Sequence, residues 1–167
     1  MEVIRSPAVS QLEFFGYICA DLGYMNNVDL EAMKYDWCKK LGGEWWGAFH
    51  NNEIVSVAGC HPFHDGWRVL FRGAQVMPAQ HGLSKTHMTS IPWRYILPKQ
   101  LEYIKGAPAY ITTNVEHDAS GLMNRTHRVM KMLSKQNIVE WFAEEEMYGA
   151  LQTVWKLNVE EYTKTLV

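Results

Sequence analysis

Residues 44–76 read EWWGAFHNNEIVSVAGCHPFHDGWRVLFRGAQV, and this stretch decides the fold. Three runs within it, 44–50, 53–61 and 67–76, have the length and the apolar and aromatic content of β-strands. Asn51-Asn52 joins the first two runs, and because asparagine tolerates positive φ angles this pair predicts a tight hairpin. The turn segment HPFHDG precedes the third run, so the sequence predicts a three-stranded antiparallel meander.

Two features inside the meander bear on what it does. Gly73 interrupts the third run, which predicts a β-bulge or a close approach of another backbone. Trp45 and Trp46 are neighbours on one strand and therefore point to opposite faces of the sheet. We expect one of them in the core and the other on the wall of a cleft.

Helical patterns precede the meander. A short strand is expected at 2–5, then a helix over 8–22 and a second helix over 27–41 that Asn27 caps. The apolar positions at helical spacing are Leu12, Phe15, Cys19 and Leu22 in the first helix, and Leu30, Met33, Trp37 and Leu41 in the second.

The chain after the meander alternates helices and strands. A polar loop at 77–90 leads to a helix that Pro92 opens, and Pro98 predicts a kink or a late start in that helix. A strand at 109–114 and a helix at 119–135, with Met130 and Leu133 in the core, come next. Two final strands, 138–142 and 151–157, are expected with the acidic segment EEEMYG as their link.

Composition limits the classes of protein. The 167 residues are 47% hydrophobic and 20% charged, as in a globular protein, and we expect residues 1–167 to form one domain. A formal net charge of −2 provides no general positive field for nucleic acid. No run approaches the about 20 apolar residues of a membrane span, and the first ten residues lack a signal peptide's apolar core. Three cysteines in no paired spacing favour a reducing compartment, so we expect a cytoplasmic protein.

The predicted order β-α-α-β-β-β-α-β-α-β-β resembles that of the GNAT superfamily of N-acyltransferases over nearly the whole chain. The best local match lies at the end of the meander. There the family has Val-x-Pro and then a Gln/Arg-x-x-Gly-x-Gly/Ala turn, and this chain has Val76, Pro78, Gln80 and Gly82. The spacing is one residue shorter and the second glycine is missing. The resemblance implies an α/β fold with a mixed, mostly antiparallel sheet of about seven strands flanked by about four helices.

In the family this turn holds coenzyme A, because its backbone N–H groups and the following helix N-terminus converge on the pyrophosphate. The preceding strand presents its backbone to the pantetheine arm, and Gly73 fits the bulge that opens the sheet there. The resemblance therefore implies acetyl-CoA as co-substrate, whereas a plain surface loop is the alternative. The implied cofactor-binding residues are Gln75, Val76, Met77, Gln80, His81, Gly82, Leu83, Ser84 and Lys85, with Asn114 at the end of the next strand.

Transfer of an acetyl group from a thioester to an amine needs a base for the amine proton and an acid for the thiolate. Because histidine titrates near neutrality, His61 and His117 are candidate bases, with an ordinary surface histidine as the alternative for each. The family often places the acid, a tyrosine, on the helix after the strand 109–114. Helix 119–135 has no tyrosine, and Tyr148 is a candidate substitute. Further candidate bases are Glu44, His64 and Glu116.

Three other patterns favour plainer interpretations. Cys60, His61 and His64 lie close together, but the two short ligand pairs typical of zinc are absent, so we expect no metal. No His/Asn spacing supports Cys60 as a nucleophile. The basic residues of helix 119–135 suit a solvated face, or contact with an acidic partner such as the 3′-phosphate of the cofactor. They are Arg125, Arg128, Lys131 and Lys135.

The resemblance implies direct transfer of an acetyl group from acetyl-CoA to an amine of a small molecule or peptide. From the net charge and the lack of a long apolar run we expect no nucleic-acid or membrane partner, and a homodimer stays open. Two alternatives remain. One is a degenerate GNAT fold that serves as a non-catalytic CoA-binding or protein-interaction module. The other is a nucleic-acid-binding domain that uses exposed aromatic side chains.

Overall fold

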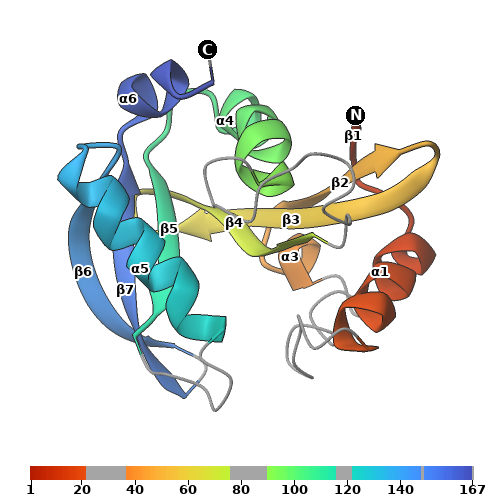
Figure 1. The fold of residues 1–167 in the computed structure, drawn as a ribbon, viewed down its shortest axis with the longest axis horizontal. Helices are drawn as coiled ribbons and strands as arrows, with labels where there is room; N and C mark the ends of the chain where they lie inside the picture. Colours follow the sequence, from red (N-terminus) through yellow and green to blue (C-terminus); the bar gives the residue numbers. More distant parts are fainter. Residues whose placement is uncertain (22–36, 76–89, 116–121, 148, 167) are drawn as a thin grey trace. The chain divides into compact units, whose positions relative to one another are not determined.

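A computed structural model describes residues 1–21, 37–75, 90–115, 122–147 and 149–166 (Figure 1). The chain forms two compact units, Met1–Ala107 and Pro108–Val167. The expectation that residues 1–167 make one domain stays a prediction. Within the described ranges, no helix combines the length and the hydropathy that a membrane crossing requires.

The first unit contains the predicted meander. Its sheet consists of β1 (Glu2–Arg5), β2 (Glu44–His50), β3 (Glu53–Phe63) and β4 (Gly66–Gln75), each strand antiparallel to the next. The Asn pair makes the β2–β3 hairpin as predicted, since Asn51 and Asn52 have φ angles of 51° and 66°. Two consecutive positive φ angles are the mark of a type I′ turn, whose twist matches that of paired strands.

One face of this sheet carries α1 (Val9–Asp21) and α3 (Trp37–Lys40) (Figure 1). Their buried side chains form an apolar core with the sheet, which contains Leu12, Phe15, Cys19, Cys38, Trp45, Phe49, Ile54, Val57 and Phe71. The helix over 8–22 is therefore confirmed. Of the second predicted helix only the end at 37–40 is described, and Leu41 is 48% exposed because it follows the helix instead of lying in its apolar stripe.

The opposite face of the sheet carries η3 (Pro92–Ile96) and α4 (Leu97–Ile104) (Figure 1). The N–H of Leu97 donates to the carbonyl of Pro92, five residues earlier, so the helix begins as one π turn. Pro98 then lies in the first turn of α4, directly after the π turn, so the residue without an N–H falls where the helical hydrogen-bond pattern changes. Trp46 is buried on this face against the edge of Tyr103, so neither tryptophan lies on an open cleft wall.

The second unit contains β5 (Ala109–Asn114), α5 (Leu122–Lys135), β6 (Val139–Met147), β7 (Ala150–Leu157) and α6 (Val159–Lys164). Strand β7 pairs antiparallel with both β5 and β6. Helix α5 covers one face of these strands (Figure 1), and its residues Met130 and Leu133 are fully buried, as expected.

Two predictions for this unit are wrong. The acidic stretch Glu144–Met147 belongs to β6 and does not form the link between the last two strands. Strand β6 lies at the edge of the sheet, where charged side chains can point into water. The predicted order also ends with a strand, whereas helix α6 follows β7 in the structure. Helix α6 begins at Asn158, whose side-chain oxygen accepts the N–H of Glu161 at 3.2 Å, and Glu160 and Glu161 lie in the first turn.

Replacement of Asn52 by valine tests the hairpin. A β-branched residue in the left-handed region costs about 1–2 kcal/mol, so Asn52→Val lowers the free energy of unfolding by that amount in urea titrations. Asn52→Gly is the matched control, because glycine adopts positive φ without strain. Equal stability of the two variants would show that the turn adopts another conformation in solution.

Candidate functional site

The site begins with an irregularity in β4. Cys60 of β3 lies opposite two residues of β4, 69–70, and Ala58 lies opposite 72–73, so β4 contains two consecutive bulges. The bulge expected at Gly73 is therefore present, and a second one lies next to it. A Cβ at Gly73 would lie 3.2 Å from the carbonyl oxygen of Leu70, tighter than most such contacts. The lack of a side chain at this position suits the crowded backbone.

Both bulges place a bulky residue in the left-handed region. Leu70 has a φ angle of 53° and Arg72 one of 55°, although a left-handed residue other than glycine costs about 1–2 kcal/mol. Phe71 lies between them, buried, with the Arg72 guanidinium 5.0 Å from the centre of its ring. Strain of this kind persists only where the surrounding structure holds it in place, and it gathers at functional sites.

Polar side chains hold the bulged segment. The Gln100 side chain, fully buried on α4, accepts the N–H of Leu70 at 2.9 Å and donates to the carbonyl of Gly59 at 3.0 Å. The buried Ser56 hydroxyl donates to the carbonyl of Ala74 at 2.6 Å. These bonds satisfy backbone groups on both sides of the irregularity, which buried backbone requires. The sequence analysis missed both residues, since an isolated Gln or Ser gives no signal before the fold is known.

Gln75, predicted to bind cofactor, has a structural contact. Its side-chain oxygen accepts the N–H of Ile91 at 2.6 Å, and Ile91 caps η3. The bond joins the last residue of β4 to the start of the following helix. The other expected cofactor residues of this segment, Val76, Met77, Gln80, His81, Gly82, Leu83, Ser84 and Lys85, lie outside the described residues.

His61 has the chemistry of a general base. The side chain is 6% exposed, and Nδ1 lies 2.8 Å from the carbonyl oxygen of Pro62. Because a carbonyl only accepts, Nδ1 carries the proton of the neutral ring and Nε2 keeps its lone pair. Nε2 is buried and has no hydrogen-bond partner within the part of the chain that the structure describes. Burial lowers the pKa of His61 below 6.5 against the opposing effect of the Pro62 carbonyl, and the charge of Arg68 lowers it further.

The His61 ring packs against the bulged strand. It meets Phe71 edge-to-face with 5.0 Å between ring centres, and it meets Phe63 in the same way at 6.2 Å. The Arg68 guanidinium, itself buried, lies 4.7 Å from the centre of the Phe71 ring. The structure therefore places an unprotonated histidine nitrogen directly beside the strained segment of β4.

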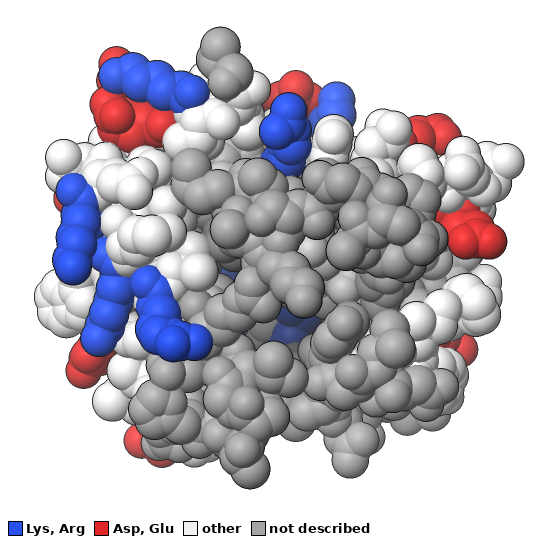
Figure 2. Space-filling model, viewed as in Figure 1, with Lys and Arg blue, Asp and Glu red and all other residues white. Residues whose placement is uncertain are grey.

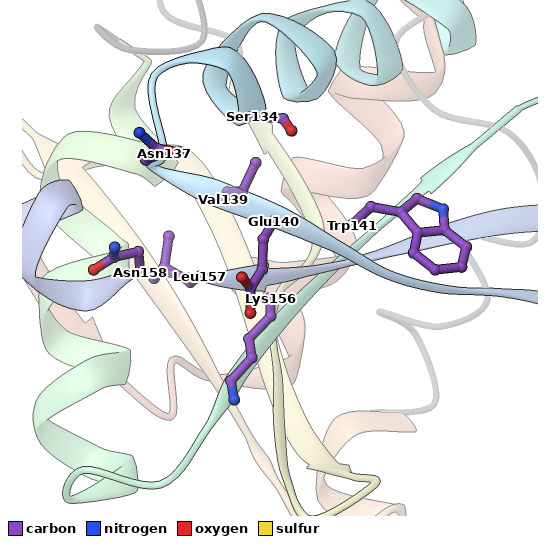
Figure 3. Close-up of a pocket in the computed structure, with 8 residues that line it drawn as sticks. All are labelled: Ser134, Asn137, Val139, Glu140, Trp141, Lys156, Leu157 and Asn158. Atoms are coloured by element: carbon purple, nitrogen blue, oxygen red, sulfur yellow. The ribbon is translucent and has the colours of Figure 1, made fainter.

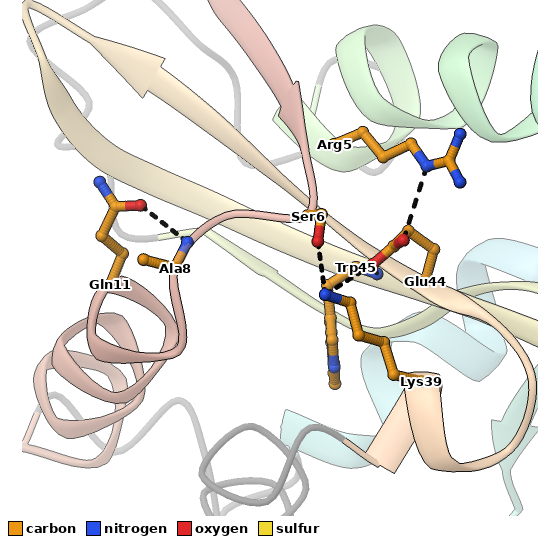
Figure 4. A network of polar contacts seen from close by, with 7 residues as sticks. All are labelled: Arg5, Ser6, Ala8, Gln11, Lys39, Glu44 and Trp45. Atoms are coloured by element: carbon orange, nitrogen blue, oxygen red, sulfur yellow. Dashed lines mark hydrogen bonds and ion pairs between the residues drawn. The ribbon is translucent and has the colours of Figure 1, made fainter.

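Glu44 is engaged in a structural network (Figure 4). Its carboxylate lies 3.5 Å from Arg5 Nε and 3.8 Å from Lys39 Nζ, and it accepts the N–H of Trp45 at 3.1 Å. The Lys39 ammonium also contacts the Ser6 hydroxyl at 2.5 Å. The network ties β1, α3 and β2 together, and these contacts favour a structural role for Glu44 over that of a base.

The structure gives no support for a catalytic role of Cys60 or of the remaining described candidates. Burial raises the pKa of the Cys60 thiol to about 12, so the thiolate that a nucleophile needs is not populated at neutral pH. His64 is exposed in the β3–β4 turn with a φ angle of 51°. Among the described residues no three His, Cys, Asp or Glu side chains are placed to hold a metal ion. His117, Glu116 and Tyr148 lie outside the described residues.

The second unit contains a buried polar cluster that the sequence analysis did not find. Trp155 Nε1 donates to the Thr113 hydroxyl at 2.8 Å, and that hydroxyl lies 2.9 Å from His127 Nδ1. Burial lowers the pKa of His127, Lys131 lowers it further, and Glu144 opposes this. Asn114 follows Thr113 as the half-buried last residue of β5, in register with Gln152.

The second unit has two notable surface features, a depression and a group of basic side chains. An open depression of about 580 Å³ lies where α5 ends over β6 and β7, and the cross-strand pair Glu140 and Lys156 lies on its wall (Figure 3). No predicted cofactor or catalytic residue lies among its lining residues. Basic side chains gather over α5 (Figure 2). Arg128, Lys131 and Lys135 are exposed there, as expected of a solvated face.

Solved structures of known proteins share this fold. An aminoglycoside 6′-N-acetyltransferase from Enterococcus faecium is 12% identical, with a TM-score of 0.60 over 93% of this chain and 96% of its own. A protein assigned to the GNAT family of acetyltransferases from Desulfovibrio desulfuricans is also 12% identical, with a TM-score of 0.63 over 95% and 99%. An aminoglycoside 6′-N-acetyltransferase in complex with coenzyme A gives a TM-score of 0.58 at 12% identity over 93% and 96%.

These likenesses show that the chain has the GNAT acyltransferase fold, as the sequence resemblance implies. No protein-family model matches the chain, and no curated protein sequence does. The likeness is one of architecture, and activity has to be argued from the site.

Proposed function

We propose that this protein is an N-acetyltransferase that transfers the acetyl group of acetyl-CoA directly to an amine of a small molecule or peptide. The observation that carries the proposal is the doubly bulged strand β4 with the neutral, buried His61 beside it, in a chain of GNAT fold. In that fold the strand before the phosphate-binding turn presents its backbone to the pantetheine arm of the cofactor. The coenzyme A complex of a protein of similar fold supports this choice of cofactor.

Each group has a definite task in the proposed reaction. The amine nitrogen attacks the thioester carbonyl carbon, its C–N bond forms, and the C–S bond to coenzyme A then breaks. His61 Nε2 takes the proton that the amine loses, either directly or through a water molecule. Tyr148 remains a candidate to protonate the departing thiolate, with solvent as the alternative, and His117 remains an alternative candidate base. Asn114 remains a candidate cofactor contact.

The acceptor class rests on two considerations. The aminoglycoside 6′-N-acetyltransferases of similar fold act on a small molecule, as their name states. His61 is neutral at neutral pH and can accept the proton that an amine nitrogen loses during attack. A protonated imidazole could not accept that proton. We retain a cytoplasmic location as part of the proposal.

Binding of acetyl-CoA is the first test. At about a hundred times its dissociation constant a ligand adds about 2.7 kcal/mol, which raises the melting temperature by about 5–10 °C for a chain of this size. Acetyl-CoA and desulfo-CoA are expected to give this shift, and ATP is the control that does not. Gly82→Asp abolishes the shift by placing a negative charge against the pyrophosphate, and Lys85→Ala weakens it modestly. No shift at millimolar acetyl-CoA contradicts the proposal.

Replacement of the proposed base is the second test. Thiol release from acetyl-CoA is measured with kanamycin, spermidine and a peptide with a free amino terminus as amine probes. His61→Gln lowers kcat by about 10²–10⁴-fold and leaves the dissociation constant of acetyl-CoA unchanged. His64→Gln, two residues away and exposed, is the matched control and keeps full activity.

The pH dependence follows from the lowered pKa of His61. Wild-type kcat rises with pH as His61 loses its proton below pH 6.5 and is level above that, whereas His61→Gln lacks this rise. An unchanged pH–rate profile in His61→Gln excludes His61 as the base. Binding of acetyl-CoA without transfer to any probe favours the non-catalytic CoA-binding module.

A further inference from the structure

We infer that Gln100 is a positioning residue for the cofactor-binding strand. Its side-chain amide fixes the path of the β4 backbone through Leu70–Gly73 and so sets where the pantetheine arm is held. The inference deepens the proposed function and rests on it. Gln100 has no expected contact with substrate, and its influence passes through the backbone that it binds.

The Gln100 amide is buried and fully engaged by backbone groups. Gln100 is fully buried on α4, together with Leu97 and Ile104 on the same helix. Burying an amide is unfavourable unless its donor and acceptor are both satisfied, and an apolar residue of the same shape would serve packing equally well. Both ends of this amide are satisfied by backbone, Leu70 N–H at 2.9 Å and the Gly59 carbonyl at 3.0 Å. The group therefore specifies geometry more than it adds stability.

The two hydrogen bonds of Gln100 lie at the irregular part of the β3–β4 pairing. Gly59 pairs with Phe71, between the two bulges, and Leu70 belongs to the first bulge and has a left-handed backbone. Gln100 thus joins β3 and β4 at the point where their register slips. Without this tie Leu70 can relax toward an extended conformation. A slip of one residue in register turns every later side chain of a strand to the other face.

The segment that Gln100 binds also contacts the proposed base His61 through Phe71. Leu70 is the direct neighbour of Phe71, whose ring packs against His61 at 5.0 Å and against Trp45 at 6.1 Å between ring centres. A change in the Leu70 backbone therefore moves Phe71 and the wall that His61 packs on. The same change displaces the backbone of Gly73 and Ala74, which in this fold faces the pantetheine arm.

The test compares three variants. Gln100→Met keeps the length of the side chain and removes both hydrogen bonds. Gln100→Glu keeps an acceptor for Leu70, and only its protonated form can also donate to the Gly59 carbonyl. Lys99→Ala, exposed on the same helix, is the matched control. Amide hydrogen exchange at Leu70 is measured without ligand, and dissociation constants are measured for acetyl-CoA and for adenosine 3′-phosphate 5′-diphosphate, the cofactor fragment without pantetheine.

The expected result is specific to the pantetheine arm. In Gln100→Met the Leu70 amide exchanges faster. Acetyl-CoA binds about tenfold more weakly, which is the effect of losing one hydrogen bond between the pantetheine arm and the β4 backbone. The fragment binds as before, because the pyrophosphate is held by other residues. In Gln100→Glu the affinity for acetyl-CoA relative to wild type rises as the pH falls, since protonation restores the donor. Partial unfolding of the variant would instead weaken the binding of acetyl-CoA and of the fragment by the same factor.

Two results overturn the inference. One is an unchanged Leu70 exchange rate in Gln100→Met, and the other is an equal loss of affinity for acetyl-CoA and the fragment. If the wild-type chain binds neither ligand, the proposed function fails and the role of Gln100 in cofactor binding fails with it. The Leu70 exchange rate then decides separately whether Gln100 fixes the bulge.

Discussion

The first unit depends on a mismatch in length between two paired strands. Between His61 and Val57 strand β4 has two residues more than β3, and the two bulges that accommodate them place Leu70 and Arg72 in the left-handed region. Side-chain hydrogen bonds from Gln100 and Ser56 hold this arrangement. The strained segment is therefore an integral part of the fold, because side chains on both α4 and β3 bind its backbone.

The mismatch also organises the chemistry of the site. Phe71, held between the two bulges, packs against His61 and Trp45 on the core face of the sheet. Burial keeps His61 neutral, and the bond to Pro62 leaves its second nitrogen as the one with the lone pair. The carboxylate of Glu44, a rival candidate base, is held in an ion-pair network, and burial keeps the Cys60 thiol protonated at neutral pH. We therefore propose His61 as the base, since its Nε2 has no hydrogen-bond partner among the described residues.

Local chemistry explains how much of the fold the sequence predicts. The Asn51-Asn52 turn, the bulge at Gly73 and the apolar face of α1 follow from residue types whose preferences hold in any context. The acidic strand segment Glu144–Met147 and helix α6 escape prediction, because an edge strand tolerates charge and a six-residue helix carries little periodicity. Residue type and position alone predict His61 as a candidate base. The Gln100 tie joins residues 30 and 41 positions apart, which no local pattern reveals.

The central claim is that acetyl-CoA lies along the bulged strand. Titration of acetyl-CoA into uniformly ¹⁵N-labelled protein, followed through backbone amide chemical shifts, tests it most directly. The account predicts the largest shifts at Phe71, Gly73, Ala74 and Gln75, with desulfo-CoA reproducing most of them. Shifts confined to the residues around the depression in the second unit, such as Asn137, Glu140 and Lys156, would contradict the account.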